Sequence, residues 1–156
     1  MSRERFFEIA CVVLLAVFIA VMLAGNAGSS KTAEEVFTPV VSQVDLDTLK
    51  VRDNKVIVKE FSFGEDDVEN VIYISSDSVM EVRELLLVEA KSSDDVQKLT
   101  ELIKTRIESK KALFKNYAPE QSALLENYTL VKKGKFILYT VYDSPEKIVS
   151  AFKKAL

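Results

Sequence analysis

The hydrophobic and polar positions of this chain divide it into two regions with different patterns. Residues 6–24 are almost continuously apolar, and Glu8 is the only charge among them. A helix of these 19 residues is about 28 Å long, close to the roughly 30 Å hydrocarbon core of a bilayer. Farther along the chain, apolar residues recur at helical or strand spacing among polar ones. The pattern therefore predicts one N-terminal transmembrane helix followed by a globular domain.

The charges that flank the apolar run predict its orientation. Arg3 and Arg5 precede it, and Lys31 is the only nearby cation after it. The positive-inside rule then places the N-terminus in the cytoplasm and the domain outside, in a single-pass protein of the cell membrane. A cleaved signal peptide is the alternative, with Gly25 and Ala27 in the −3 and −1 positions. We favour the anchor, because signal peptides usually have apolar stretches of only about 7–15 residues. A buried helix of a soluble protein is a third interpretation, but no later segment is apolar enough to pack against it.

The end of the apolar run has most of a lipid-attachment motif. Leu23-Ala24-Gly25-Asn26 follows the bacterial lipobox pattern Leu-Ala-Gly-Cys, with Asn26 in the place of the lipid-bearing cysteine. Cys11, the only cysteine, lies near the start of the run and cannot replace it. We therefore expect no lipid at this position. The expected organisation is a membrane anchor or signal segment at 1–25, a flexible linker at 26–31 and an extracytoplasmic α+β domain at 32–156.

Helical patterns open, divide and close the domain. A capping box at Thr32-Ala33-Glu34-Glu35 begins the first helix, in which Val36, Val40 and Val44 share one face. The long helix is predicted over residues 93–117, because Leu99, Ile103 and Ile107 recur every four residues and Leu113 or Phe114 continues the stripe. Ser92 or Ser93 is its expected N-cap, and Lys98, Glu101, Lys104 and Glu108 form its polar face. Pro119 begins a further turn or short helix, and Ser144-Pro145 begins the last helix.

Runs of β-branched and aromatic residues predict the strands of a sheet. Lys133-Gly134 lies between the last two runs and indicates a hairpin. Residues 54–63 fit either a strand or a short helix. The predicted order is helix, strand, strand, long helix, strand, strand, helix, which favours an antiparallel four-stranded sheet covered by helices on one face. The expected strands are residues 71–74, 85–90, 129–132 and 135–142.

Composition excludes several functions. Among 156 residues there is no histidine, so the commonest general base and the commonest transition-metal ligand are missing, and the one cysteine cannot build a thiolate metal site. The acidic groups at 45–47, 65–67 and 94–95 lack the glycine and distal glutamate of an EF-hand loop. The net charge is −3, and the first 30 residues contribute two arginines and two glutamates, so the domain is mildly acidic. We therefore expect no metal, no cofactor and no nucleic-acid partner.

Three stretches of the domain carry a resemblance to a known family. The most specific is Arg106-Ile107-Glu108-Ser109-Lys110-Lys111, followed by Tyr117-Ala118-Pro119-Glu120-Gln121 and Leu125-Glu126-Asn127. The others are Ala33-Glu34-Glu35-Val36 leading to Val44-Asp45-Leu46, and the closing Ala151-Phe152-Lys153-Lys154-Ala155-Leu156. On these residues the domain resembles an uncharacterised family, domain of unknown function 4358, found in small lipoprotein-like envelope proteins of Gram-positive bacteria. The resemblance implies an envelope location but no activity, ligand or catalytic residue.

One segment after the long helix is the best candidate for an interaction loop, since loops on rigid elements often bind partners. The alternative is structural: Tyr117 packs the helix end and Pro119 starts the next helix. Tyrosines on the strands (73, 139 and 142) are expected to pack the sheet first and to bind ligands second. The candidate interaction residues are Tyr117, Pro119, Glu120 and Gln121.

The function predicted from these observations is that of a non-catalytic module of the cell envelope. Its membrane contact is through residues 6–24, and its partner is another envelope protein, a peptide or a wall component. The alternative is a small carboxylate-dependent hydrolase that acts on envelope polymers, which needs two acids facing each other across a cleft. Convergent acids with raised pKa values favour the enzyme, whereas an exposed apolar patch favours the binding module. A purely structural spacer is the third possibility.

Overall fold

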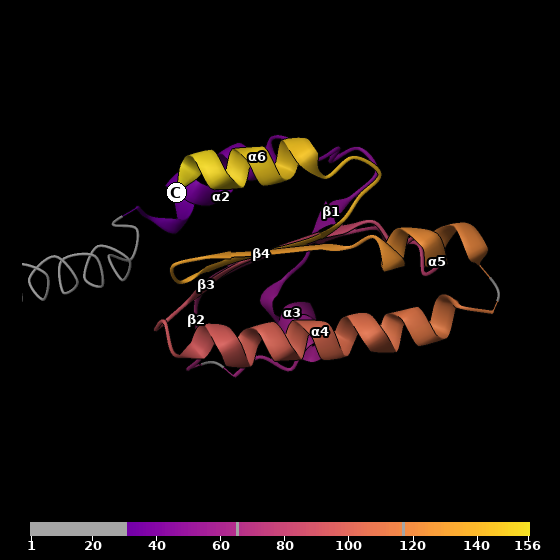
Figure 1. The fold of residues 1–156 in the computed structure, drawn as a ribbon, viewed down its shortest axis with the longest axis horizontal. Helices are drawn as coiled ribbons and strands as arrows, with labels where there is room; N and C mark the ends of the chain where they lie inside the picture. The colour runs from indigo at the N-terminus through magenta and orange to yellow at the C-terminus, as the bar shows by residue number, and fades with distance from the viewer. Residues whose placement is uncertain (1–30, 65, 117) are drawn as a thin grey trace, which may run out of the picture. The chain divides into compact units, whose positions relative to one another are not determined.

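The fold is built on one antiparallel sheet of five strands. The computed structural model describes residues 31–64, 66–116 and 118–156, which belong to one compact unit, Lys31–Leu156. The strands lie in the order β1-β2-β3-β5-β4, and every neighbouring pair is antiparallel. Figure 1 shows them between two sets of helices. The strands are β1 (Lys50–Val51), β2 (Val68–Ser75), β3 (Glu84–Ala90), β4 (Thr129–Lys133) and β5 (Phe136–Val141).

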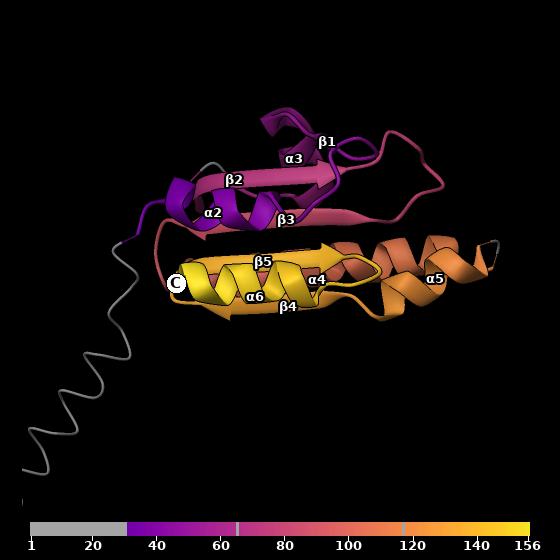
Figure 2. The same cartoon turned by 90° about the horizontal axis from the view of Figure 1, so that it is seen from above.

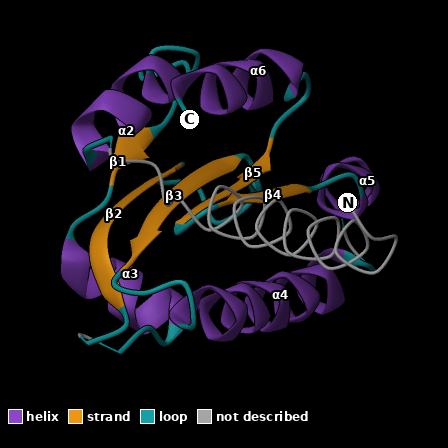
Figure 3. Ribbon diagram, turned by 60° about the vertical axis from the view of Figure 1, so that its left-hand side comes forward, coloured by secondary structure: helices purple, strands orange, loops and turns teal. Residues whose placement is uncertain are grey.

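Helices cover both faces of this sheet. In Figures 1 and 3, α2 and α6 lie on one face, α3 and α4 lie on the other, and α5 continues beside one end of α4. The α+β class is confirmed, but the prediction of four strands with helices on one face was wrong. The physical reason is visible in β3 and β5, where every residue is buried, so neither strand has a solvent face. The helices are α2 (Ala33–Val41), α3 (Asn54–Phe61), α4 (Asp95–Phe114), α5 (Pro119–Glu126) and α6 (Glu146–Ala155).

The long helix α4 is the central element of one core. Leu99, Ile103 and Ile107 are fully buried against the sheet, as their spacing predicts. Phe114 continues the stripe, whereas Leu113 is exposed. The N-cap of α4 is Asp94, which makes no side-chain capping hydrogen bond, so the prediction of Ser92 or Ser93 was wrong. Ser92 instead closes the turn before the helix: the Asp95 N–H donates to its hydroxyl at 3.3 Å, and the Ser92 N–H donates to the Asp95 carboxylate at 3.1 Å. Lys98, Glu101, Lys104 and Glu108 are exposed, as expected for the polar face.

The first half of the domain corrects other expectations. The capping box of Thr32 and Glu35 is confirmed, but the helix it opens ends at Val41. Most of the ambiguous stretch 54–63 forms α3, which ends at Phe61; the Asp53 carboxylate accepts the Val56 N–H at 3.0 Å and starts the helix there. β1, at Lys50–Val51, was missed because two residues are too few to show a pattern.

Within the residues that the structure describes, no helix combines the length and the apolar character needed to cross a membrane. The predicted span at residues 6–24 and all of the predicted linker 26–31 except Lys31 lie outside those residues.

Substituting Ile103 by Ala tests the packing of α4. Removing a fully buried side chain of this size typically lowers the free energy of unfolding by about 2–5 kcal/mol. Lys104→Ala is the matched control, because Lys104 is exposed and its ion pair with Glu101 is a surface pair; it should change the free energy by less than about 0.5 kcal/mol. Equal losses in urea unfolding of the two variants would show that α4 does not pack through this face.

Candidate functional site

A buried carboxylate organises the side of the sheet that α4 covers. Glu84 is the first residue of β3 and is 0% exposed. Leu86, two residues on, pairs with Tyr73 of β2 and with Tyr139 of β5. Side chains two residues apart share a face of a strand, so both tyrosines lie on the face of Glu84. Their hydroxyl groups extend along that face to the carboxylate.

The opposing charges come from α4. Arg106 and Lys110 are four residues apart, which places them on one side of the helix. Arg106 donates from both terminal nitrogens to Glu84, Nη1 to Oε1 at 2.8 Å and Nη2 to Oε2 at 3.0 Å. Lys110 Nζ donates to Oε2 at 2.9 Å. The charged ends of these two α4 side chains therefore bind the first residue of β3.

The tyrosine hydroxyls complete the shell of donors. Tyr139 donates to Oε1 of Glu84 at 2.5 Å, and Tyr73 donates to Oε2 at 2.7 Å. The carboxylate therefore accepts five hydrogen bonds. Among the described residues, every buried side-chain nitrogen and oxygen has a partner. We call Glu84, Arg106, Lys110, Tyr73 and Tyr139 the Glu84 network.

Electrostatics favour the ionised form of Glu84. Burial by itself raises the pKa of a carboxyl group, but the charges of Arg106 and Lys110 outweigh it and hold the pKa of Glu84 at about 2. Burial and the adjacent carboxylate raise the pKa of Tyr73 and that of Tyr139, so both hydroxyls remain donors. Burial also lowers the pKa of Lys110, against the attraction of Glu84. The network is a fixed anion surrounded by donors.

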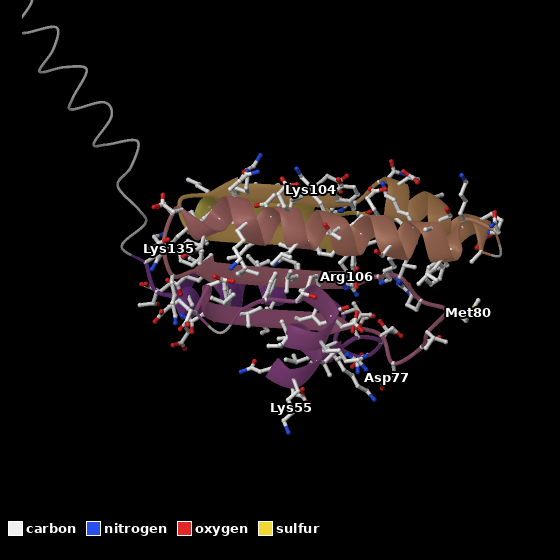
Figure 4. All side chains as sticks on the ribbon, turned by 90° about the horizontal axis from the view of Figure 1, so that it is seen from below. Lys55, Asp77, Met80, Lys104, Arg106 and Lys135 are labelled. Carbon is white, nitrogen blue, oxygen red and sulfur yellow. The ribbon has the colours of Figure 1, made fainter. Side chains whose placement is uncertain are left out.

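A groove borders the network on its outer side. It has a volume of about 350 Å³ and lies between α4 and residues 76–83, the loop that joins β2 to β3. Arg106, Lys110 and Tyr73 of the network line this groove, and so do Val79 and Leu113. In Figure 4, Arg106 lies on α4 near this loop, whereas Met80 points away from the domain.

The network does not have the properties of an acid–base site. A general acid at neutral pH needs a raised pKa and access to substrate, whereas Glu84 has a lowered pKa and is enclosed by donors. Among the described residues, every carboxyl group with a shifted pKa has a lowered pKa. These groups are Glu35, Asp67, Asp77, Glu81 and Glu84. In the same part of the chain, no three acidic or sulfur-containing side chains gather as metal ligands would.

The predicted interaction loop has a partly structural role. Pro119 is the first residue of α5, and it and Glu120 are exposed. Gln121 is engaged: its side-chain carbonyl accepts the Val82 N–H at 2.9 Å, which ties α5 to the β2–β3 loop beside the groove. Tyr117 lies outside the described residues.

Sequence reasoning missed the Glu84 network as a unit. Tyr73 and Tyr139 do pack the sheet, as expected, but Glu84, Arg106 and Lys110 were not singled out as a site. One signal was available, because Glu84 is a charge that directly precedes the apolar run Leu85-Leu86-Leu87-Val88. Its partners are distant in sequence, so only the fold reveals the pairing.

Fold and site together define a small α+β domain with a closed, buried charge network. The chain belongs to the family whose model is described as "Domain of unknown function (DUF4358)", which matches residues 42–142, more than half of the chain. The matched range includes the whole Glu84 network and the stretch from Arg106 to Lys111 on which the resemblance rests. No match was found among curated proteins or among solved structures.

Glu84→Gln tests the network through its pH dependence. The pKa of Glu84 in the folded protein is about 2, below the roughly 4.3 of an unfolded chain, so its ionisation stabilises the fold above about pH 4.3. That contribution is lost as the pH falls toward 2. At pH 7 the variant leaves Arg106 and Lys110 without the negative charge that they bind. Its free energy of unfolding should therefore fall by about 3–5 kcal/mol.

Urea unfolding at pH 7 and at pH 3 measures this difference. The difference in free energy of unfolding between wild type and Glu84→Gln should be smaller at pH 3 than at pH 7. Glu101→Gln removes an exposed carboxylate of α4 and should cost less than about 0.5 kcal/mol at both pH values. A gap that is the same at pH 3 and pH 7 would contradict the assignment of an ionised, network-held Glu84.

Proposed function

We propose that this protein is a membrane-tethered, extracytoplasmic binding module of the cell envelope without catalytic activity. Its tether is the apolar segment at residues 6–24. Its domain presents the groove beside the Glu84 network to another envelope protein, a peptide or a wall component. The observation that carries the proposal is the closed network: the charges that converge in the core bind one another, which leaves the surface to make external contacts.

Apolar side chains at the groove support a role in binding. Val79 is 86% exposed and Leu113 is 65% exposed, and Met80 on the same loop is half-exposed. Large side chains of this kind are seldom grouped at the surface of a domain unless they contact a partner. Serine hydroxyls also line the groove, at positions 75, 76, 78 and 109. Apolar anchors with neighbouring polar groups are typical of protein and peptide binding sites.

The arrangement of the domain suits a tether. The start of the described chain (indigo) lies at the same end of the domain as the C-terminal end of α6, whereas the β2–β3 loop and α5 lie at the opposite end (Figures 1 and 2). A tether that enters at Lys31 therefore joins the domain at the end away from the groove. Asn26 in the lipobox-like run fits a lipoprotein-like relative in which an apolar helix replaces the lipid.

The hydrolase alternative has weaker support. It requires a carboxylic acid that stays protonated near neutral pH to protonate the leaving group. The shifted carboxyl groups of the described residues are all shifted in the opposite direction, toward ionisation. Glu60 and Glu81 line the groove, but Glu60 binds Arg106 at 3.0 Å and Glu81 binds Arg83 at 2.8 Å.

Membrane fractionation tests the tether. The full-length protein should remain in the membrane pellet after alkaline washing and after washing with about 1 M salt, in which charges are screened beyond about 3 Å. An apolar span is held in the membrane by burial and not by charge. Recovery of only a shortened form in the medium, beginning near Gly28, would show instead that residues 1–25 act as a cleaved signal.

Crosslinking in whole cells tests the binding face. A photoreactive amino acid at Val79 or Leu113 should form a discrete adduct with one envelope component, and the same residue at Lys104 should not. Lys104 is the matched position because it is exposed on α4 but does not line the groove. Equal labelling at the three positions, or adducts with none of them, would count against this face.

A further inference from the structure

The outer edge of β2 is only partly covered by β1. β1 pairs with Ser75 and Ile74 alone. The Arg52 N–H then donates to the Tyr73 carbonyl at 2.8 Å, and the chain turns away into α3. Among the described residues, 68–72 of β2 therefore have β3 on one side and no strand on the other. The sheet has an unfinished edge at this point.

The main chain at this edge is oriented to accept another strand. In an antiparallel sheet the N–H and C=O of one residue point to the same side, and alternate residues point to the same side. The Tyr73 carbonyl points toward β1, so the N–H and C=O of Val71 point outward on that side. Neither group forms a hydrogen bond with any described residue. Such groups are a template for an incoming peptide backbone.

Two hollows flank this edge, one on each face of the sheet. The hollow on the α2 side measures about 520 Å³, and Phe37, Val41, Leu46 and Ile72 contribute to its lining. The hollow on the α3 side measures about 420 Å³, with Val58, Phe63, Val68 and Val71 in its lining. Val71 and Ile72 are adjacent and point to opposite faces, so the two hollows meet at one step of the strand. Leu46 is 49% exposed and Val58 is 46% exposed.

We propose that the β2 edge binds an extended segment of another polypeptide, which adds to the sheet beside Val71 as a sixth strand. Consecutive side chains of an extended segment point to opposite faces. A run of three or four apolar residues would therefore fill the α2-side and α3-side hollows in turn, while its backbone pairs with Val71. The unpaired peptide groups indicate that the ligand is a polypeptide backbone, and the two apolar hollows indicate that its segment carries apolar side chains on both faces.

A second copy of the chain fits this edge less well. Two β2 edges paired about a twofold axis would bring the exposed Glu69 side chains of both copies to neighbouring cross-strand positions, where like charges repel. The register shift between Val68 and Asn70 also limits the regular edge to a few residues. A short segment of a different protein avoids both problems.

The opposite edge of the sheet makes the contrast clear. β4 carries Lys132 and Lys133 at exposed positions, and lysines on an edge strand are a common protection against added strands. Residues 68–72 contain no lysine. This proposal uses a surface other than the groove and requires neither the membrane tether nor the partner proposed above.

A peptide-binding measurement with the full-length protein in detergent micelles tests the inference. The probe is a fluorescent, end-capped heptapeptide, Lys-Thr-Val-Ile-Val-Thr-Lys, followed by fluorescence anisotropy. Saturable binding is expected. Leu46→Lys and Val58→Lys place a charge in one hollow each and should each weaken binding by about tenfold or more. Ala112→Lys adds the same charge at an exposed site on α4 and should change binding by less than about twofold.

Backbone methylation separates strand addition from general stickiness. One heptapeptide is N-methylated at its odd positions and another at its even positions. Only one of them should lose binding, because alternate N–H groups face β2 and the others face solvent. Hydrogen exchange of the full-length protein gives an independent measure, since the bound peptide should slow exchange of the Val71 amide.

Several results would overturn the inference. The first is that the peptide shows no saturable binding, and the second is that the two methylated peptides bind equally. The third is that Ala112→Lys weakens binding as much as Leu46→Lys does. Concentration-dependent dimerisation that Val58→Lys abolishes would instead identify a second copy as the occupant. Thermal melts of the variants should overlay that of the wild type, because both substituted side chains are half-exposed; variants that melt early are replaced by Leu46→Ser and Val58→Ser.

Discussion

The fold depends on how one carboxylate is kept ionised inside it. Moving a carboxylate out of water costs several kcal/mol, and removing its partner afterwards costs about 3–5 kcal/mol. Glu84 is stabilised by two cations from α4 and two hydroxyls from the neighbouring strands. A buried ion pair of this kind adds little net stability compared with apolar side chains of the same volume. Its hydrogen bonds, however, form in only one arrangement of the helix and the strands. We infer that the network fixes where α4 lies along the sheet, while Leu99, Ile103 and Ile107 supply the burial energy.

The network also holds α3, whose Ile57 and Phe61 are buried in the same core. The Arg106 guanidinium lies 4.5 Å from the centre of the Phe61 ring, and the same side chain binds Glu60. Phe61 in turn meets Tyr73 edge-on, with ring centres 5.1 Å apart. A cation over a ring and an edge-to-face ring pair each contribute roughly 0.5–1.5 kcal/mol. The α3 helix is therefore anchored at its C-terminal end by the same arginine that neutralises Glu84.

Sequence reasoning succeeded where a feature depends on neighbours along the chain. The Thr32 capping box, the four-residue spacing of Leu99, Ile103 and Ile107, and the hairpin at Gly134, which has a positive φ of 57°, are local. The second helical layer, β1 and the Glu84 network depend on residues far apart in sequence. Nothing near Glu84 reveals that Arg106 and Tyr139 will surround it. The unbroken apolar runs of β3 and β5 did indicate burial on both faces, and the single-layer prediction overlooked that signal.

The network and the open edge share β2, and this connection makes the edge rigid before any partner arrives. The Tyr73 side chain is held by Glu84 and Arg106, and its carbonyl is held by the Arg52 N–H. Val71 is two residues away on the same strand and is held to β3 by the regular pairing of its neighbours. Ordering a flexible backbone on binding costs about 1–2 kcal/mol for each residue. An edge whose strand is already fixed avoids that cost on its own side, so a short segment with few main-chain bonds is sufficient for recognition.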